Sequence, residues 1–146
     1  MKVWQGPAIL IFNDAKFKDS DFKSLMQIRV GGKQNDDTKI GKFGLGFNSC
    51  YHFTDAPSFI SGDSIAFLDP QEKFLPTKDG KTQRGIIGPI PRYGIHQYPE
   101  KDQLVPFMGI EGIDFQSTFE GTLFRIPLRQ QPSELTDSKN CIVQFQ

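Results

Sequence analysis

Three glycines lie close together in one short segment, at Gly41, Gly44 and Gly46, and a short amphipathic run follows them as far as Phe53. Glycine lets the backbone adopt a positive φ and approach a ligand closely. A helix beginning at Gly46 would direct its unpaired N–H groups and its positive dipole end at the same loop, which is how proteins hold phosphate groups. The segment therefore favours a phosphate-binding loop and nucleotide binding, with an ordinary glycine-rich loop as the alternative.

Two familiar phosphate-binding motifs do not fit this segment. The ending Gly-Lys-Ser/Thr of a P-loop is missing, because Gly46 is followed by Phe47. A dinucleotide-binding fold would place a strand directly before the glycines and an acidic residue about 20 positions after them. The sequence offers neither feature cleanly, so it predicts a third type of phosphate loop.

The composition of the chain limits the classes of function that it can serve. The chain has 146 residues, the size of one domain, and its 17 basic and 17 acidic residues balance, which argues against nucleic acid or an anionic membrane as partner. Its 14 phenylalanines predict a phenylalanine-rich core. Cys50 and Cys141 lack metal-site or redox spacing, and His52 and His96 are the two histidines, so no zinc site or Ser/His/Asp triad is indicated.

The compartment is predicted from segments that the sequence lacks. The apolar run after residue 7 is too short for a signal peptide, and no stretch approaches the roughly 20 apolar residues of a membrane span. We read both cysteines as reduced. These features predict a cytoplasmic protein, with a nuclear one as the alternative.

The hydrophobic pattern predicts elements of both kinds. Residues 8–12 form an apolar run typical of a buried strand, and a helix follows over residues 21–28, capped by Asp19 or Ser20. Residues 31–39 are polar and read as a loop that leads into the glycine segment, after which we expect a helix over residues 46–53.

The second half predicts a hairpin and a late strand. Residues 57–61 and 64–69 are β-like runs on either side of Gly62-Asp63. Long connections are expected over residues 70–106, with one helix near 101–108, and residues 121–128 read as a strand that Pro127 places at an edge or ends. The pattern predicts an α+β fold with a mixed, mostly antiparallel sheet and helices on one face; a doubly wound parallel sheet would need regular alternation, which the hairpin breaks.

Five blocks of sequence resemble the GHKL ATPase superfamily, which includes gyrase and the heat-shock-protein-90 chaperones. The sequence is most similar to the sacsin-type branch. The blocks are Trp4-Gln5-Gly6-Pro7-Ala8, Asn13-Asp14 with Phe17, Gly41-Lys42-Phe43-Gly44-Leu45-Gly46-Phe47-Asn48-Ser49, residues 54–62 and residues 119–129. The last two blocks fit the sacsin branch rather than the superfamily at large.

The resemblance implies a Bergerat-type two-layer α/β sandwich over residues 1–130, with residues 131–146 as a C-terminal extension. It also implies that a carboxylate after the first strand meets the adenine amino group. The family's Asp-x-Gly-x-Gly element is degenerate here and reads Asn13-Asp14-Ala15-Lys16-Phe17. Asp14 is the better hydrogen-bond acceptor, although an alignment on Phe17 leaves neither Asn13 nor Asp14 in register, and the two residues can equally form a plain turn.

The resemblance also assigns the phosphate and strand positions. The family's second glycine box, whose backbone amides hold phosphates, corresponds to Gly41, Lys42, Phe43, Gly44, Leu45, Gly46 and Phe47. Residues 31–39 correspond to a lid over ATP. Lys33 and Lys42 would offer charge to phosphate oxygens or else remain solvated. Thr122 would approach the adenine or serve as an ordinary strand threonine.

One family feature lies outside this sequence. GHKL ATPases use an upstream helix carrying a Glu that activates water and an Asn that binds Mg²⁺, and only seven residues precede the strand at Ala8. We therefore expect an N-terminally truncated domain with no catalytic residue and no protein metal ligand of its own, in which Mg²⁺ would bind through the phosphates or through that missing Asn.

Three functions follow from the resemblance. The first is an ATP- or ADP-binding module of a sacsin-like, chaperone-related protein, unable to hydrolyse ATP alone, with protein clients or co-chaperones as further partners. The second is a pseudo-ATPase scaffold for protein interaction with no nucleotide bound. The third is an independent ATPase. The first two differ in whether Asn13 or Asp14 points inward beneath Thr122.

Overall fold

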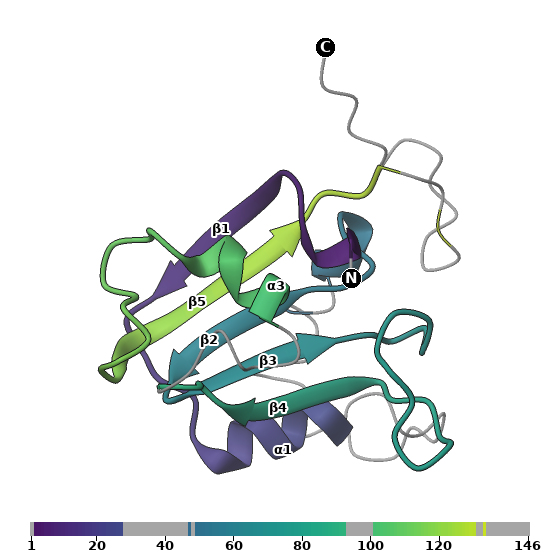
Figure 1. The fold of residues 1–146 in the computed structure, drawn as a ribbon, viewed down its shortest axis with the longest axis horizontal. Coiled ribbons are helices and arrows are strands. Elements are labelled where there is room, and N and C mark those ends of the chain that lie inside the picture. The colour runs from purple at the N-terminus through teal and green to yellow at the C-terminus, as the bar shows by residue number, and fades with distance from the viewer. Residues whose placement is uncertain (1, 28–46, 48, 93–100, 131–132, 134–146) are drawn as a thin grey trace.

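A five-stranded sheet forms the centre of the molecule. The structure, a computed structural model, describes residues 2–27, 47, 49–92, 101–130 and 133. The strands run in the order β1-β5-β2-β3-β4, and every neighbouring pair is antiparallel (Figure 1). Their bounds are β1 (Ala8–Asn13), β2 (Ser58–Gly62), β3 (Ser64–Leu68), β4 (Gly85–Pro89) and β5 (Phe119–Pro127). The predicted α+β class is confirmed, whereas the expected mixed sheet is antiparallel throughout the described strands.

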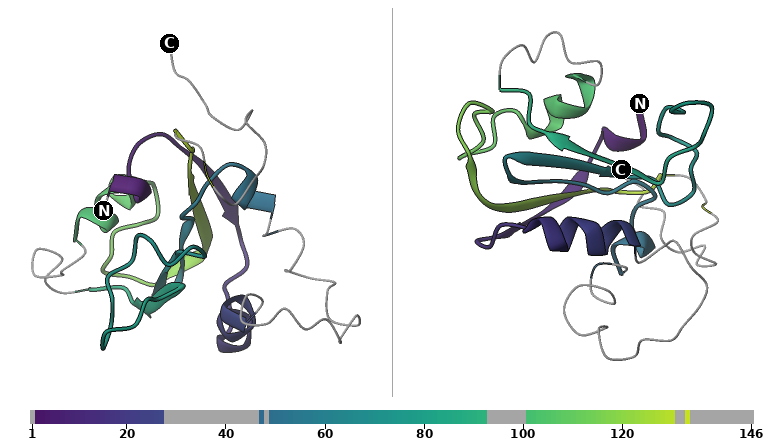
Figure 2. Two further views of the ribbon diagram at one scale, coloured as in Figure 1. Left: turned by 90° about the vertical axis from the view of Figure 1, so that its right-hand side faces the viewer. Right: turned by 90° about the horizontal axis from the view of Figure 1, so that it is seen from below.

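Short helices lie on both faces of this sheet. Helix α1 (Asp19–Gln27) covers one face, and the helices η1 (Lys2–Trp4), α3 (Lys101–Leu104) and η4 (Val105–Phe107) lie on the other (Figure 2). The expectation of helices on one face therefore does not describe this arrangement. Neighbouring residues of a strand point to opposite faces. Phe59 packs with the α1 side and Ile60 with the opposite side, so both faces carry apolar surface that must be covered.

The predicted hairpin is confirmed, and one strand was missed. Ser61 pairs with Ser64 across a two-residue turn, in which Gly62 has a φ of +56°, the sign that a type II′ turn requires of its first central residue. The missed strand is β4, within residues 70–106, where long connections and one helix near 101–108 were expected. Its two glycines and a proline weaken the strand pattern, and pairing with β3, such as Ile87 with Ala66, is what specifies it.

Phenylalanine fills much of the core, as the composition predicts. On the α1 face, Phe17 lies with its ring centroid 5.0 Å from that of Phe59, and Phe124 lies 5.2 Å from the same ring. Phe22 of α1 stacks on Phe59 at 5.9 Å. Contacts between aromatic rings at these separations add to the free energy gained by burial. They fix α1 against the sheet and with it the chain that leads from β1.

Arg125 fastens the start of β1 to β5. Its guanidinium donates to the backbone carbonyls of Trp4 and Gly6, the latter at 2.6 Å. Burial lowers the pKa of Arg125 from its usual high value. The backbone N–H of Leu128 also donates to the carbonyl of Pro7 at 2.9 Å. These bonds set the position of β1, from which the candidate site is built.

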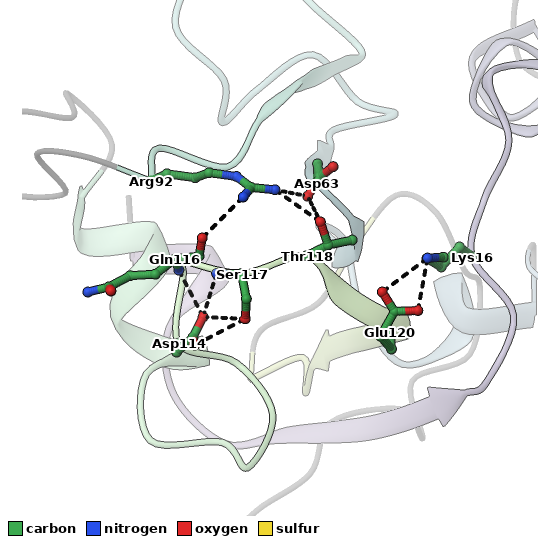
Figure 3. Close-up of polar contacts among 8 residues, drawn as sticks. All are labelled: Lys16, Asp63, Arg92, Asp114, Gln116, Ser117, Thr118 and Glu120. Atoms are coloured by element: carbon green, nitrogen blue, oxygen red, sulfur yellow. Dashed lines mark hydrogen bonds and ion pairs between the residues drawn. The ribbon is translucent and has the colours of Figure 1, made fainter.

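Polar contacts fasten one end of the sheet, where the β2–β3 turn approaches the segment before β5 (Figure 3). Asp63 accepts a hydrogen bond from the Thr118 hydroxyl at 2.6 Å and pairs with Arg92, which also donates to the carbonyl of Gln116 at 3.1 Å. Asp114 accepts from the backbone N–H groups of Gln116 and Ser117.

Among the described helices none is long and apolar enough to cross a membrane.

Candidate functional site

A cavity of about 380 Å³ lies on the α1 face of the sheet. Its described lining is mostly apolar and contains no charged side chain. The lining residues are Ile9, Ile11, Asn13, Phe17, Leu25, Phe47, Ser49, Cys50, Phe53, Phe124 and Ile126. Concave, largely apolar surfaces with a few polar groups are typical of small-molecule sites. Three of the predicted site residues, Asn13, Phe17 and Phe47, are among them.

Strand geometry explains which residues of β1 reach this cavity. Side chains alternate along a strand, so Ile9, Ile11 and Asn13 share one face. The intervening Leu10 and Phe12 point away, and the ring of Phe12 contacts that of Phe119 at a centroid distance of 6.0 Å. The strand thus delivers a single polar side chain to the cavity, at its C-terminal end.

Asn13, Thr122 and Ser61 form a polar row across three strands. Asn13 is paired with Thr122 in the β1–β5 register, and Thr122 with Ser61 in the β2–β5 register. The predicted proximity of the Asn13 turn and Thr122 is therefore present. Ser61 was not predicted, because nothing in the sequence around it indicates which residue lies opposite.

The two hydroxyls of this row form a chain of hydrogen bonds. The Phe17 N–H donates to Ser61 Oγ at 2.8 Å, and Thr122 Oγ1 donates to the carbonyl of Ala15 at 2.7 Å. The Ser61 and Thr122 oxygens lie 2.7 Å apart, and since the Thr122 proton is used on Ala15, Ser61 is the donor between them. Both residues are buried. The chain holds the turn over residues 13–17 against the sheet.

Asn13 and Asp14 play different parts in that turn. The Asn13 side-chain oxygen accepts the Ala15 N–H at 2.8 Å, the local bond of an Asx turn. Asp14 is exposed and does not line the cavity. Of the two candidates for base recognition, the structure thus directs Asn13 toward the cavity, and the assignment of Asp14 stays a prediction. The neighbouring Lys16 pairs with Glu120 at 2.9 Å, where both side chains are exposed (Figure 3).

Most of the glycine segment lies outside the described residues. The predicted site residues outside the described residues are Lys33, Gly41, Lys42, Phe43, Gly44, Leu45 and Gly46. Of the helix expected over residues 46–53, the described residues include Phe47, which is helical, and the 3₁₀ helix η2 (Ser49–His52). Phe53 N–H closes the helix on the Cys50 carbonyl at 2.9 Å. Ser49 and Cys50 line the cavity, so the chain that leaves the glycine segment enters the cavity wall.

Arg129 binds the C-terminal end of η2. Its guanidinium donates to the carbonyls of Tyr51, His52 and Thr54 at 2.8, 3.2 and 3.3 Å, so the carbonyls of the last turn bond to a side chain instead of to a further helical turn. The same guanidinium is paired with Asp55 at 2.8 Å. A residue just beyond β5 thereby positions the segment that forms one wall of the cavity.

Comparison with known proteins gives the family. A family model described as the Sacsin domain matches residues 1–145. The human protein Sacsin is 38% identical over 142 residues, which cover 94% of this chain and 3% of that protein. This chain belongs to the sacsin-domain family. The predicted sacsin-type resemblance is therefore confirmed, and the chain spans a small part of the length of the relative that it matches.

The cavity of this sacsin domain offers aromatic and aliphatic contacts and one side-chain amide. Four phenylalanines, Phe17, Phe47, Phe53 and Phe124, line the cavity together with Asn13, whose side chain ends in an amide. Among the residues that the structure describes, no group of three or more histidine, cysteine, aspartate or glutamate side chains is placed to hold a metal ion. The described lining also contains no carboxylate or imidazole that could activate a water molecule.

Sequence reasoning missed most of the apolar lining of this sacsin domain. Ile9, Ile11, Phe124 and Ile126 read as ordinary strand residues, and only the β1–β5 register, which pairs Ile11 with Phe124 and Ile9 with Ile126, brings them together. The signal that could have found them is the alternation within β1 combined with the expected place of Asn13 at its end.

Proposed function

We propose that this sacsin domain is the nucleotide-binding module of a larger, chaperone-related protein, with a sheet and site of the GHKL type. The observation that carries the proposal is the cavity on the α1 face. Its wall joins the Asn13 turn to Ser49 and Cys50, which directly follow the glycine segment. An aromatic, uncharged pocket suits a nucleobase, and the adjoining glycine segment, with Lys33 and Lys42, suits its phosphates.

The described lining favours binding over hydrolysis by this domain alone. Transfer of a phosphoryl group to water needs a positioned nucleophile and neutralisation of charge by a metal or a cation. The described cavity residues supply neither. We therefore assign ATP or ADP as ligand, Mg²⁺ as an ion that would bind through the phosphates, and a cytoplasmic setting with protein clients or co-chaperones as further partners.

The first test is calorimetric titration of the folded 146-residue chain with ATP and ADP, with and without Mg²⁺. Binding is expected, and Gly46→Val should weaken it by about tenfold or more, because a branched side chain obstructs a tight phosphate turn. Gly88→Val is the matched control, since Gly88 lies in β4 and a Cβ there meets no atom within 4 Å. Unchanged affinity of Gly46→Val for ATP and ADP would contradict the assignment of the glycine segment as a phosphate-binding loop.

A second function is favoured by the surface of β1. Four consecutive apolar residues of this outer strand, Ile9, Leu10, Ile11 and Phe12, are 40–60% exposed. An outer strand of this kind, free of charged or proline residues, is typical of a surface that another protein covers. A folded chain that binds no nucleotide in the titration would therefore support a pseudo-ATPase scaffold for protein interaction.

A further inference from the structure

The end of the cavity where a base would be recognised is formed by the C-terminal end of β1. Asn13 is the polar residue that β1 contributes to the lining, and Asp14 lies beyond the strand. The alternation of side chains along β1 places Asn13 on the same face as Ile9 and Ile11. Any contact from β1 to the polar edge of a base therefore has to come from Asn13.

The hydroxyls of Ser61 and Thr122, which lie next to Asn13 in the polar row, already donate hydrogen bonds within the protein. Ser61 uses its proton on Thr122, and Thr122 uses its proton on the Ala15 carbonyl. The exposed fractions of Ser61 and Thr122 are 2% and 1%. Buried hydroxyls with their protons engaged have no donor left for a ligand. Their role is to hold the turn that carries Asn13, so the side-chain amide of Asn13 is the group that meets the base at this end of the cavity. Ser49, which also lines the cavity, belongs to η2.

The Asx turn fixes how that amide is oriented. Because the Ala15 N–H needs an acceptor, the atom 2.8 Å from it is the Asn13 oxygen, and the amide nitrogen occupies the other branch of the side chain. This nitrogen carries two N–H donors, and the oxygen keeps one further lone pair. Asn13 therefore presents both a donor and an acceptor.

We infer that the base end of the cavity reads a purine through the neutral side-chain amide of Asn13, and so does not distinguish 6-amino from 6-oxo purine nucleotides. This inference rests on the proposed nucleotide-binding function. Adenine presents a donor at position 6 beside an acceptor at N1, and hypoxanthine presents the reverse. A side-chain amide can pair with either edge after reorientation of the base, whereas a carboxylate only accepts and repels a 6-oxo oxygen.

The test compares ATP with ITP, which are nearly isosteric and differ in the hydrogen-bonding pattern of this edge. We expect the full chain to bind the two with dissociation constants within about threefold of each other. Asn13→Asp should keep the Asx turn, because a carboxylate oxygen accepts the Ala15 N–H equally well. The same variant should shift the ratio toward ATP by about tenfold or more.

Asp14→Asn tests the other residue predicted to recognise the base, and it changes charge by one unit in the opposite sense next to the same turn, outside the cavity lining. Its ATP to ITP ratio should equal that of the unmodified chain. Binding of ATP at least about tenfold tighter than ITP by the unmodified chain, or a changed ratio in Asp14→Asn, would overturn the inference and leave nucleotide binding intact. Failure of the folded chain to bind either nucleotide would overturn the proposed function, and the inference with it.

Discussion

At the scale of single residues, close approach of two strands explains why Gly121 occupies its position in β5. A Cβ atom built on Gly121 would lie 2.6 Å from the backbone oxygen of Asn13 and 2.7 Å from the ring of Phe12. The residue also has a φ of +151°, which side-chain-bearing residues rarely adopt. Glycine at this point lets β1 lie against β5 where Asn13 is paired with Thr122.

Gly121→Ala should therefore destabilise the fold by about 1–3 kcal/mol, because the new methyl group forces β1 away from β5. Chemical denaturation followed by circular dichroism measures the change. Gly88→Ala is a suitable control, since it adds a methyl group to another strand glycine in open space and should change the free energy of unfolding by less than about 0.5 kcal/mol. Equal stabilities of the two variants would show that the strands do not approach as closely as described.

At the scale of elements, the connections to the cavity wall depend on side chains that bridge distant segments. Arg129 joins the end of β5 to η2 and to Asp55, and the exposed fractions of the two side chains are 3% and 15%. Ser133 also donates to Asp55. A buried ion pair of this kind adds little compared with apolar packing, but removal of one partner leaves a buried charge without compensation.

Arg129→Met should lower the free energy of unfolding by about 3–5 kcal/mol, since Asp55 loses its ion-pair partner and the carbonyls of Tyr51 and His52 lose a donor. Lys16→Met breaks the Lys16–Glu120 pair, whose side chains are 45% and 76% exposed, and should cost only about 0–1 kcal/mol. Urea unfolding of the two variants tests the difference. A loss in Arg129→Met no larger than that in Lys16→Met would contradict the stabilising role of the Arg129–Asp55 ion pair.

At the scale of the whole molecule, carboxylates hydrogen-bonded in the folded state make stability depend on pH. The Thr118 hydroxyl, together with Arg92, lowers the pKa of Asp63. Hydrogen bonds from Thr82 and Arg84 lower the pKa of Glu72, and the backbone N–H groups of Ser117 and Gln116 lower that of Asp114. A carboxylate whose pKa is lower in the folded state stabilises the fold above its unfolded pKa.

This contribution is lost as the pH falls through the lowered folded pKa values. Stability should therefore be nearly constant from pH 7 to about pH 5 and should decline below about pH 4. Thermal melts across this range measure the decline. A variant combining Asp63→Asn, Glu72→Gln and Asp114→Asn should show a shallower decline than the unmodified chain, and an equally steep decline would assign the acid sensitivity to other groups.

Local pattern predicted much of the fold, since β1, α1, the hairpin, the helix near residues 101–108 and the late strand all carry their own signals in chain order. The expectation that residues 8–12 form a buried strand was wrong, because β1 is an exposed outer strand of the sheet. Periodicity, turn residues and caps act within a few residues, and so they are readable without the fold. The strand β4 was missed because its sequence is poor in strand formers. The contact of Arg129 with the Tyr51 carbonyl of η2 could not be predicted, because the two residues lie far apart in the sequence.

The sequence by itself determined the family and the residue types available near the site, because blocks such as residues 119–129 carry specific resemblance. Only the tertiary structure decided that Asn13 lines the cavity, that the Thr122 hydroxyl donates to the carbonyl of Ala15, and that Ser61 completes the chain of hydrogen bonds. The physical reason is strand register: one residue of shift sends a side chain to the opposite face of the sheet. Which residues face one another across strands follows from long-range pairing and packing, and these are not written in any local stretch of sequence.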